Sequence, residues 1–101
     1  MDILNEVYDE LHCRGMVSSH NEFSVKWLNK SARYMSMIRA SDQEVTLDTL
    51  GRLAANLKVR NDACKSSRYG ELREKVVWLQ PLTNKVWTAL YHRALERQQI
   101  S

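Results

Sequence analysis

Three histidines and two cysteines are among the side chains in this sequence that can act as nucleophiles, proton carriers or metal ligands. His12 and Cys13 are adjacent, so on a helix they diverge by about 100° and do not form a catalytic pair. His12, His20 and His92 show no metal-type spacing with carboxylates, and neither a glycine-rich phosphate loop nor a nucleophile elbow is present. We therefore expect no enzymatic activity, no metal and no cofactor.

Cationic side chains offer a different chemistry, which is contact with phosphates. The chain has 15 lysines and arginines against 12 acids, a net charge of +3, and a pI near 9.0. Residues 1–29 carry five acids and two bases, residues 30–65 carry seven bases and four acids, and residues 66–101 carry six bases and three acids. Positive charge therefore begins at Lys30, and it permits phosphate binding.

The composition predicts one all-α folding unit. Hydrophobic residues make up 44% and charged residues 27% of the 101 residues, which is typical of a single globular domain. Only three glycines and one proline occur, and residues of high helix propensity are spread throughout.

The cysteines and the distribution of apolar residues predict a cytoplasmic protein. Cys13 and Cys64 fall inside predicted helices without metal-type spacing, which favours free thiols of an intracellular chain over a disulfide. No apolar run reaches the length of a membrane span, and the acidic start Met1-Asp2 is unlike a signal peptide. We expect no membrane partner and no small-molecule ligand.

Two helices are predicted in the first thirty residues. Residues 2–14 repeat apolar side chains at spacings of three and four, as on one stripe of an amphipathic helix. Ser19 and Glu22 form the pattern of a capping box, in which the serine accepts from the Glu22 amide and the glutamate reaches back to the Ser19 amide. A second, short helix is therefore expected from His20, followed by a turn at Asn29, which tolerates the left-handed conformation.

A third helix is predicted from about Ala32 to Ala40, with Met35 and Ile38 facing inward. Four residues are left on its outer face: Ala32, Arg33, Ser36 and Met37.

Strong helical periodicity continues in the second half of the chain. Thr46 is expected to cap a fourth helix that runs to about Cys64. Its apolar stripe consists of Leu47, Leu50, Leu53, Ala54 and Leu57. The last third repeats apolar residues on both sides of Pro81, and proline disfavours helical geometry around it. Residues 66–80 and 82–98 therefore form either two helices or one helix with a kink near Gln80-Pro81.

The segments from Ser19 to Ile38 and from Thr46 to Leu57 resemble the Cro/C1-type, lambda-repressor-like helix-turn-helix domain. In that family an apolar–small pair, a small turn residue and an apolar–Ser–x–apolar run set the packing angle of the two motif helices. Here these positions hold Phe23-Ser24, Asn29 and Met35-Ser36-Met37-Ile38. The resemblance covers about residues 2–58, and the full chain is also similar to small bacterial proteins of unassigned function.

The resemblance implies a four-helix core in residues 1–65, with residues 66–101 as a helical extension packed on it within one folding unit. Six buried side chains are expected to hold the shape of the core: Phe23, Leu28, Met35, Ile38, Leu50 and Leu53.

The same resemblance implies duplex DNA as the partner of a small bacterial or phage transcription regulator. Base contacts would then come from the outer face of the third helix, through Ala32, Arg33, Ser36 and Met37. Phosphate contacts would come from Ser19, His20, Lys30 and Arg39.

Departures from the family pattern concern the residues that read DNA. The family often has glutamine where this chain has His20, and polar residues where it has Ala32-Arg33. Alanine has no donor or acceptor for a base edge, so these changes weaken sequence-specific readout and leave phosphate contact intact.

Aromatic residues near the C-terminus suggest a second interaction. Trp78, Trp87, Leu90 and Tyr91 are candidates for a homodimer interface, because one short helical hairpin buries little of this surface by itself. Packing within the chain, against Trp27 and the first helix, is the alternative.

A different class of function also fits, namely a protein-interaction module without specific DNA readout. Its contact surface would consist of Tyr34, Met37, Trp78 and Trp87.

Overall fold

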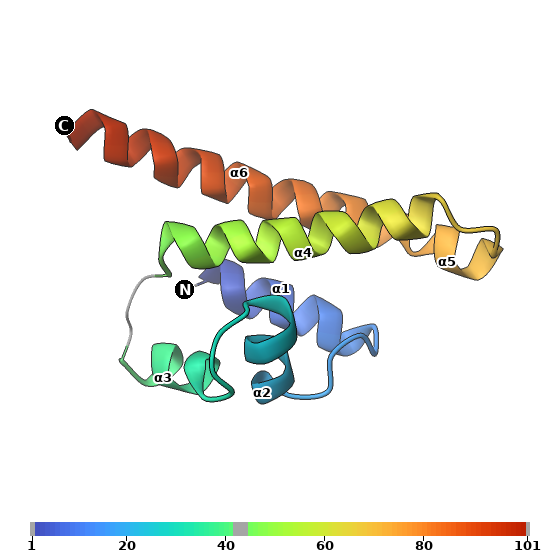
Figure 1. Ribbon diagram of the computed structural model, residues 1–101, viewed down its shortest axis with the longest axis horizontal. Helices are drawn as coiled ribbons and strands as arrows, with labels where there is room; N and C mark the ends of the chain where they lie inside the picture. Colours follow the sequence, from blue (N-terminus) through green and yellow to red (C-terminus); the bar gives the residue numbers. More distant parts are fainter. Residues whose placement is uncertain (1, 42–44, 101) are drawn as a thin grey trace.

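The computed structural model describes residues 2–41 and 45–100, and all regular elements in these residues are helical (Figure 1). The elements are α1 (Asp2–Cys13), α2 (His20–Glu22), the π-helical segment η1 (Phe23–Trp27), α3 (Tyr34–Ser41), α4 (Leu47–Lys65), α5 (Gly70–Glu74) and α6 (Val76–Ile100). The expected all-α class is thus confirmed. The predicted polar loop after α3 includes residues 42–44, which lie outside the described residues.

One buried cluster joins the N-terminal helices to α4 and α6. The six side chains expected to hold the core are all buried: Phe23, Leu28, Met35, Ile38, Leu50 and Leu53. All of them except Ile38 form one cluster with Leu79, Leu82 and Val86 of α6. The C-terminal helix therefore contributes to the main core.

Helices α4 and α6 pack side by side and run antiparallel, and in Figure 1 α4 lies between α6 and the pair formed by α2 and α3. Thr46 caps α4 as predicted, since its side chain accepts from the Thr49 amide at 3.2 Å. The apolar stripe of α4 faces the core with Leu50, Leu53 and Leu57 buried. Helix α4 is thus the central support of the fold.

Helix α1 ends in a Schellman motif at Gly15. The Met16 amide donates to the Leu11 carbonyl at 2.9 Å, and the Gly15 amide donates to the His12 carbonyl at 3.1 Å. Gly15 has a φ of 76°, a left-handed conformation that costs glycine little. This turn directs the chain from α1 towards the start of α2.

The C-terminal third does not break at Pro81. Helix α6 continues through this proline, and the break lies one residue before α6, at Lys75 after the short helix α5. Pro81 removes the amide that would bond to the Val77 carbonyl, but both residues lie on the exposed side of α6. Of the two arrangements expected for residues 66–80 and 82–98, one helix that continues across Pro81 is the one observed, although it begins only at Val76, and the helical hairpin is formed by α4 with α6.

Replacing Pro81 with alanine is expected to raise the free energy of unfolding by about 1–2 kcal/mol, since proline in a helix interior is about 3 kcal/mol worse than alanine. Part of that gain is offset by the greater freedom of the unfolded chain. Urea denaturation followed by circular dichroism measures the change. Thr88→Ala, at another exposed position of α6, is the control and is expected to change stability by no more than about 0.6 kcal/mol. A less stable Pro81→Ala variant would contradict an uninterrupted α6.

Candidate nucleic-acid interface

The N-terminus of α2 is capped by Ser19, with one difference from the prediction. Ser19 Oγ accepts from the Glu22 amide at 3.1 Å, as expected. The Glu22 carboxylate, however, accepts from the Ser18 amide at 3.3 Å and from the Ser18 hydroxyl at 3.0 Å. Ser18 thereby supplies two donors to the two carboxylate oxygens, whereas the predicted contact with the Ser19 amide would supply one.

Ser24 fixes the position of α3 against α2. Its buried hydroxyl donates to the His20 carbonyl at 2.9 Å and accepts from the Met35 amide at 3.0 Å. Around it the backbone widens into η1, where the Leu28 amide bonds to the Phe23 carbonyl five residues earlier. Asn29 then turns the chain with a φ of 56°, as expected for asparagine in a left-handed turn.

Helix α3 begins two residues later than predicted. Ala32 and Arg33 form the turn before it, and the Arg33 carbonyl accepts the Met37 amide at 2.9 Å. Arg33 is therefore at the N-cap position, because its carbonyl accepts the first backbone hydrogen bond of α3. The predicted start at Ala32 is wrong because the turn extends further than the apolar spacing indicates.

One side of α3 is buried and the other is open. Met35 and Ile38 face the core, as predicted. The four candidate base contacts are all exposed, namely Ala32, Arg33, Ser36 and Met37. Arg33, Ser36 and Met37 follow the three- and four-residue spacing of one helix face, so they form a continuous stripe.

His20 and Arg39, two of the predicted phosphate contacts, are brought together. Arg39 Nη1 donates to His20 Nε2 at 2.6 Å, and the ring centroids of Tyr8 and His20 are 4.2 Å apart. A guanidinium has no acceptor, so Nε2 must carry the lone pair and the imidazole is neutral with its proton on Nδ1. Partial burial lowers the pKa of His20 below its ordinary value of 6.5; Arg39 lowers it further, Asp9 opposes the shift, and His12 adds a smaller repulsion.

This lowered pKa predicts a loss of stability in mild acid. Below about pH 6.5 the unfolded chain binds a proton that the folded chain resists, so the free energy of unfolding falls as pH decreases. His20→Gln keeps an acceptor for Arg39 without titrating, and its stability is expected to depend less on pH. Urea midpoints between about pH 5.5 and 7.5 measure this. His92→Gln is the control, and parallel curves for the wild type and His20→Gln would contradict the prediction.

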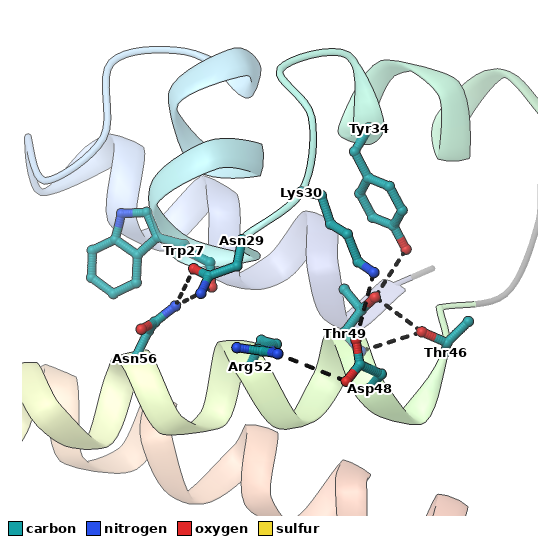
Figure 2. Close-up of polar contacts among 9 residues, drawn as sticks. All are labelled: Trp27, Asn29, Lys30, Tyr34, Thr46, Asp48, Thr49, Arg52 and Asn56. Carbon is teal, nitrogen blue, oxygen red and sulfur yellow. Dashed lines mark hydrogen bonds and ion pairs between the residues drawn. The ribbon is translucent and has the colours of Figure 1, made fainter.

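Lys30 lies in a different cluster, at the start of α4 (Figure 2). Its Nζ is 3.5 Å from a carboxylate oxygen of Asp48 and 5.8 Å from the centroid of the Tyr34 ring. The Tyr34 hydroxyl in turn lies 3.3 Å from Thr49 Oγ1. Lys30 therefore connects the turn before α3 to α4, which reduces the positive charge that it offers to a phosphate.

Asn56 supports the same turn, and sequence reasoning did not identify it. Its Nδ2 donates to the Trp27 carbonyl at 2.7 Å and lies 3.3 Å from Asn29 Oδ1 (Figure 2). The Asn56 side-chain amide thus satisfies a backbone carbonyl at the end of η1, although Asn56 lies 29 residues further along the chain. No local pattern around Asn56 marks such a contact, because it depends on tertiary structure.

The four predicted dimer residues do not share one surface. Trp78 is half-buried beside α1, where the Arg14 guanidinium lies 5.0 Å from its ring centroid. Leu90 packs against the core, whereas Trp87 and Tyr91 are exposed. Trp78 and Trp87 are nine residues apart, which is about half a turn around the axis of α6. The homodimer stays a prediction, with Trp87 and Tyr91 as its accessible candidates.

Other chemistry is sparse in the described part of the chain. No three histidine, cysteine, aspartate or glutamate side chains there are arranged to hold a metal ion. Cys13 and Cys64 are unpaired, the first exposed and the second buried. Among the helices of residues 2–41 and 45–100, none combines the length and apolar character needed to cross a membrane.

The fold and this surface define a small all-helical protein with a short exposed helix held against its neighbours by a buried serine. The chain belongs to the family of unknown function DUF6626, whose model matches residues 4–99. Comparison with curated proteins and with solved structures found no match.

Proposed function

We propose that this protein binds duplex DNA and regulates transcription, with α3 in the major groove. The observation that carries the proposal is the exposed stripe of α3 beside the His20–Arg39 pair. Residues 18–41 contain four cations and a single acid, Glu22. The cations are Lys26, Lys30, Arg33 and Arg39. A local excess of positive charge attracts the phosphate backbone.

The order of elements supports the proposal. The segment α2–η1, a turn and α3 are framed by α1 and α4, which is the order of the helix-turn-helix motif that the sequence resembles. In this arrangement Arg33 is the candidate for a guanine edge, with Ser36 and Met37 beside it. Ser19, His20 and Arg39 are the candidates for phosphates, and Lys30 contributes less because Asp48 neutralises it.

The alternative protein-interaction surface has weaker support. It requires Tyr34, Met37, Trp78 and Trp87 to be available to a partner. Tyr34 is half-buried and its hydroxyl contacts Thr49, while Trp78 is covered by Arg14. Only Met37 and Trp87 of this set are exposed, and they lie on α3 and α6 respectively.

A salt titration tests the proposal. We expect the wild type to bind a generic DNA duplex, with an affinity that falls steeply as salt increases because phosphate contacts release counterions. Arg39→Gln is expected to make the slope of log affinity against log salt shallower by about 1, the value of one phosphate contact. Arg33→Ala is expected to weaken binding about 10-fold on a preferred sequence and less on generic duplex. Fluorescence anisotropy at several salt concentrations measures both effects.

Lys85→Gln provides the matched control, since it removes an exposed cation from α6 that pairs with Glu6 of α1. It is expected to leave affinity and slope unchanged. Absence of binding at low salt, or equal losses for Lys85→Gln and Arg39→Gln, would refute the proposal.

A further inference from the structure

A polar groove of about 230 Å³ lies between α4 and α6. We call it the α4–α6 groove, and the residues of its wall that matter here are Lys58, Asn61, Lys65, Gln80, Asn84 and Trp87. In Figure 1 α4 separates α6 from α2 and α3, so this groove is distinct from the proposed DNA surface.

Asn61 is the unusual residue of the groove. Its side chain is only 2% exposed, and its Nδ2 donates to Gln80 Oε1 at 2.7 Å. Gln80 Nε2 donates in turn to Asn84 Oδ1 at 3.0 Å, so the three amides form a continuous ladder. Asn61 Oδ1, at the start of this ladder, has no hydrogen-bond partner among the described residues.

An acceptor without a donor destabilises a folded protein, and such groups are rare in native structures. Turning over the Asn61 amide alone does not remove the problem, because its oxygen would then face Gln80 Oε1. The wall of the groove therefore contains a buried acceptor to which no described residue donates.

Two further side chains of the groove, Trp87 and Lys65, offer an aromatic ring and a positive charge. Because α4 and α6 are antiparallel, Trp87 and Lys58 lie at one end of the groove and Gln80 and Lys65 at the other, with Asn61 between them. The exposed part of the Trp87 indole is available for stacking, and Lys65 supplies a positive charge. Lys58 is less available, since Asp62 Oδ2 lies 3.3 Å from its Nζ.

We propose that the α4–α6 groove binds a small planar heterocycle that bears an amino group and a negative charge, as a nucleotide does. The ring stacks on Trp87, the amino group donates to Asn61 Oδ1, and the anionic group contacts Lys65. Aromatic stacking of bases and recognition of their edges by amide side chains are established modes of nucleotide binding. This inference is independent of DNA binding by α3, and it revises the expectation that the protein has no small-molecule ligand.

Tryptophan fluorescence and calorimetry with adenosine monophosphate test the proposal. We expect saturable binding with a Kd below about 1 mM, with quenching that Trp87→Leu abolishes. Asn61→Leu is expected to weaken binding at least about 10-fold, because it removes the acceptor for the amino group. Lys65→Gln is expected to weaken it about threefold, the loss of one exposed charge contact. Lys85→Gln, on the other flank of α6, is the control and should bind as the wild type does.

Circular dichroism melting separates loss of nucleotide binding from loss of folding. Asn61→Leu is expected to be at least as stable as the wild type. No saturable binding up to about 10 mM nucleotide would overturn the proposal. It would also be overturned if inorganic phosphate competed as well as the nucleotide, or if Asn61→Leu bound normally. A mass of two chains in light scattering that Trp87→Leu reduced to one would overturn it as well, because a second copy would then cover Trp87.

Discussion

Replacing Trp27 with alanine is expected to lower the free energy of unfolding by about 3–5 kcal/mol, the range for a large aromatic side chain removed from a core. Trp27 is 2% exposed at the end of η1. The Arg60 guanidinium lies 4.9 Å from its ring centroid, so the ring also joins η1 to α4. Since small domains are stable by only about 5–15 kcal/mol, this substitution removes a large share of the total.

Trp87→Ala is the matched control because it deletes the same side chain from an exposed position of α6. Its effect is expected to be smaller, about 1–2 kcal/mol, since 42% of the Trp87 surface is already exposed in the folded protein. Urea denaturation of both variants, followed by circular dichroism, gives the comparison. Equal destabilisation by the two substitutions would mean that Trp27 is not a core residue of the folded protein.

Local patterns in the sequence were sufficient to predict most of the helices. The Ser19 and Thr46 caps and the left-handed Asn29 are correct, because each depends on hydrogen bonds or sterics within three or four residues. The inward positions Met35 and Ile38 are correct for a similar reason, since burial follows the helical period.

Contacts over long sequence separations could not be predicted in this way. Asn56 bonds to Trp27 and Asn61 bonds to Gln80 across 29 and 19 residues, and no motif marks either pair. The continuation of α6 through Pro81 also depends on context, because packing of Leu79, Leu82 and Val86 on the core offsets the lost backbone bond.

In the candidate site, too, local features were predicted from the sequence and long-range contacts were not. The outward position of Ser36 and Met37 follows from helical spacing, and the sequence predicted it. Which cations are already paired does not follow from spacing. Lys30 and Arg39 are both cations and look alike in the sequence. In the structure, however, Lys30 faces Asp48 whereas Arg39 faces a neutral histidine. Arg39 is therefore the stronger candidate for a phosphate contact, a ranking that only the structure provides.

Ser24→Val is the second substitution with a large expected effect, a loss of about 2–5 kcal/mol in the free energy of unfolding. The variant leaves the Met35 amide without its buried acceptor and adds carbon atoms to a site that is 0% exposed. Because the Ser24 hydroxyl also donates to the His20 carbonyl, the change disturbs the start of α2 and the start of α3 together. Loss of stability and loss of DNA affinity are thus expected in the same variant.

Ser36→Val separates these two losses. Ser36 is an exposed serine of α3, so the same substitution there is expected to change stability by no more than about 0.5 kcal/mol. If α3 reads DNA, Ser36→Val alters affinity while the fold is intact, and Ser24→Val alters affinity through the position of the helix. A Ser24→Val protein as stable as the wild type would show that this hydroxyl does not fix α3 against α2, and the geometric basis of the proposed interface would be lost.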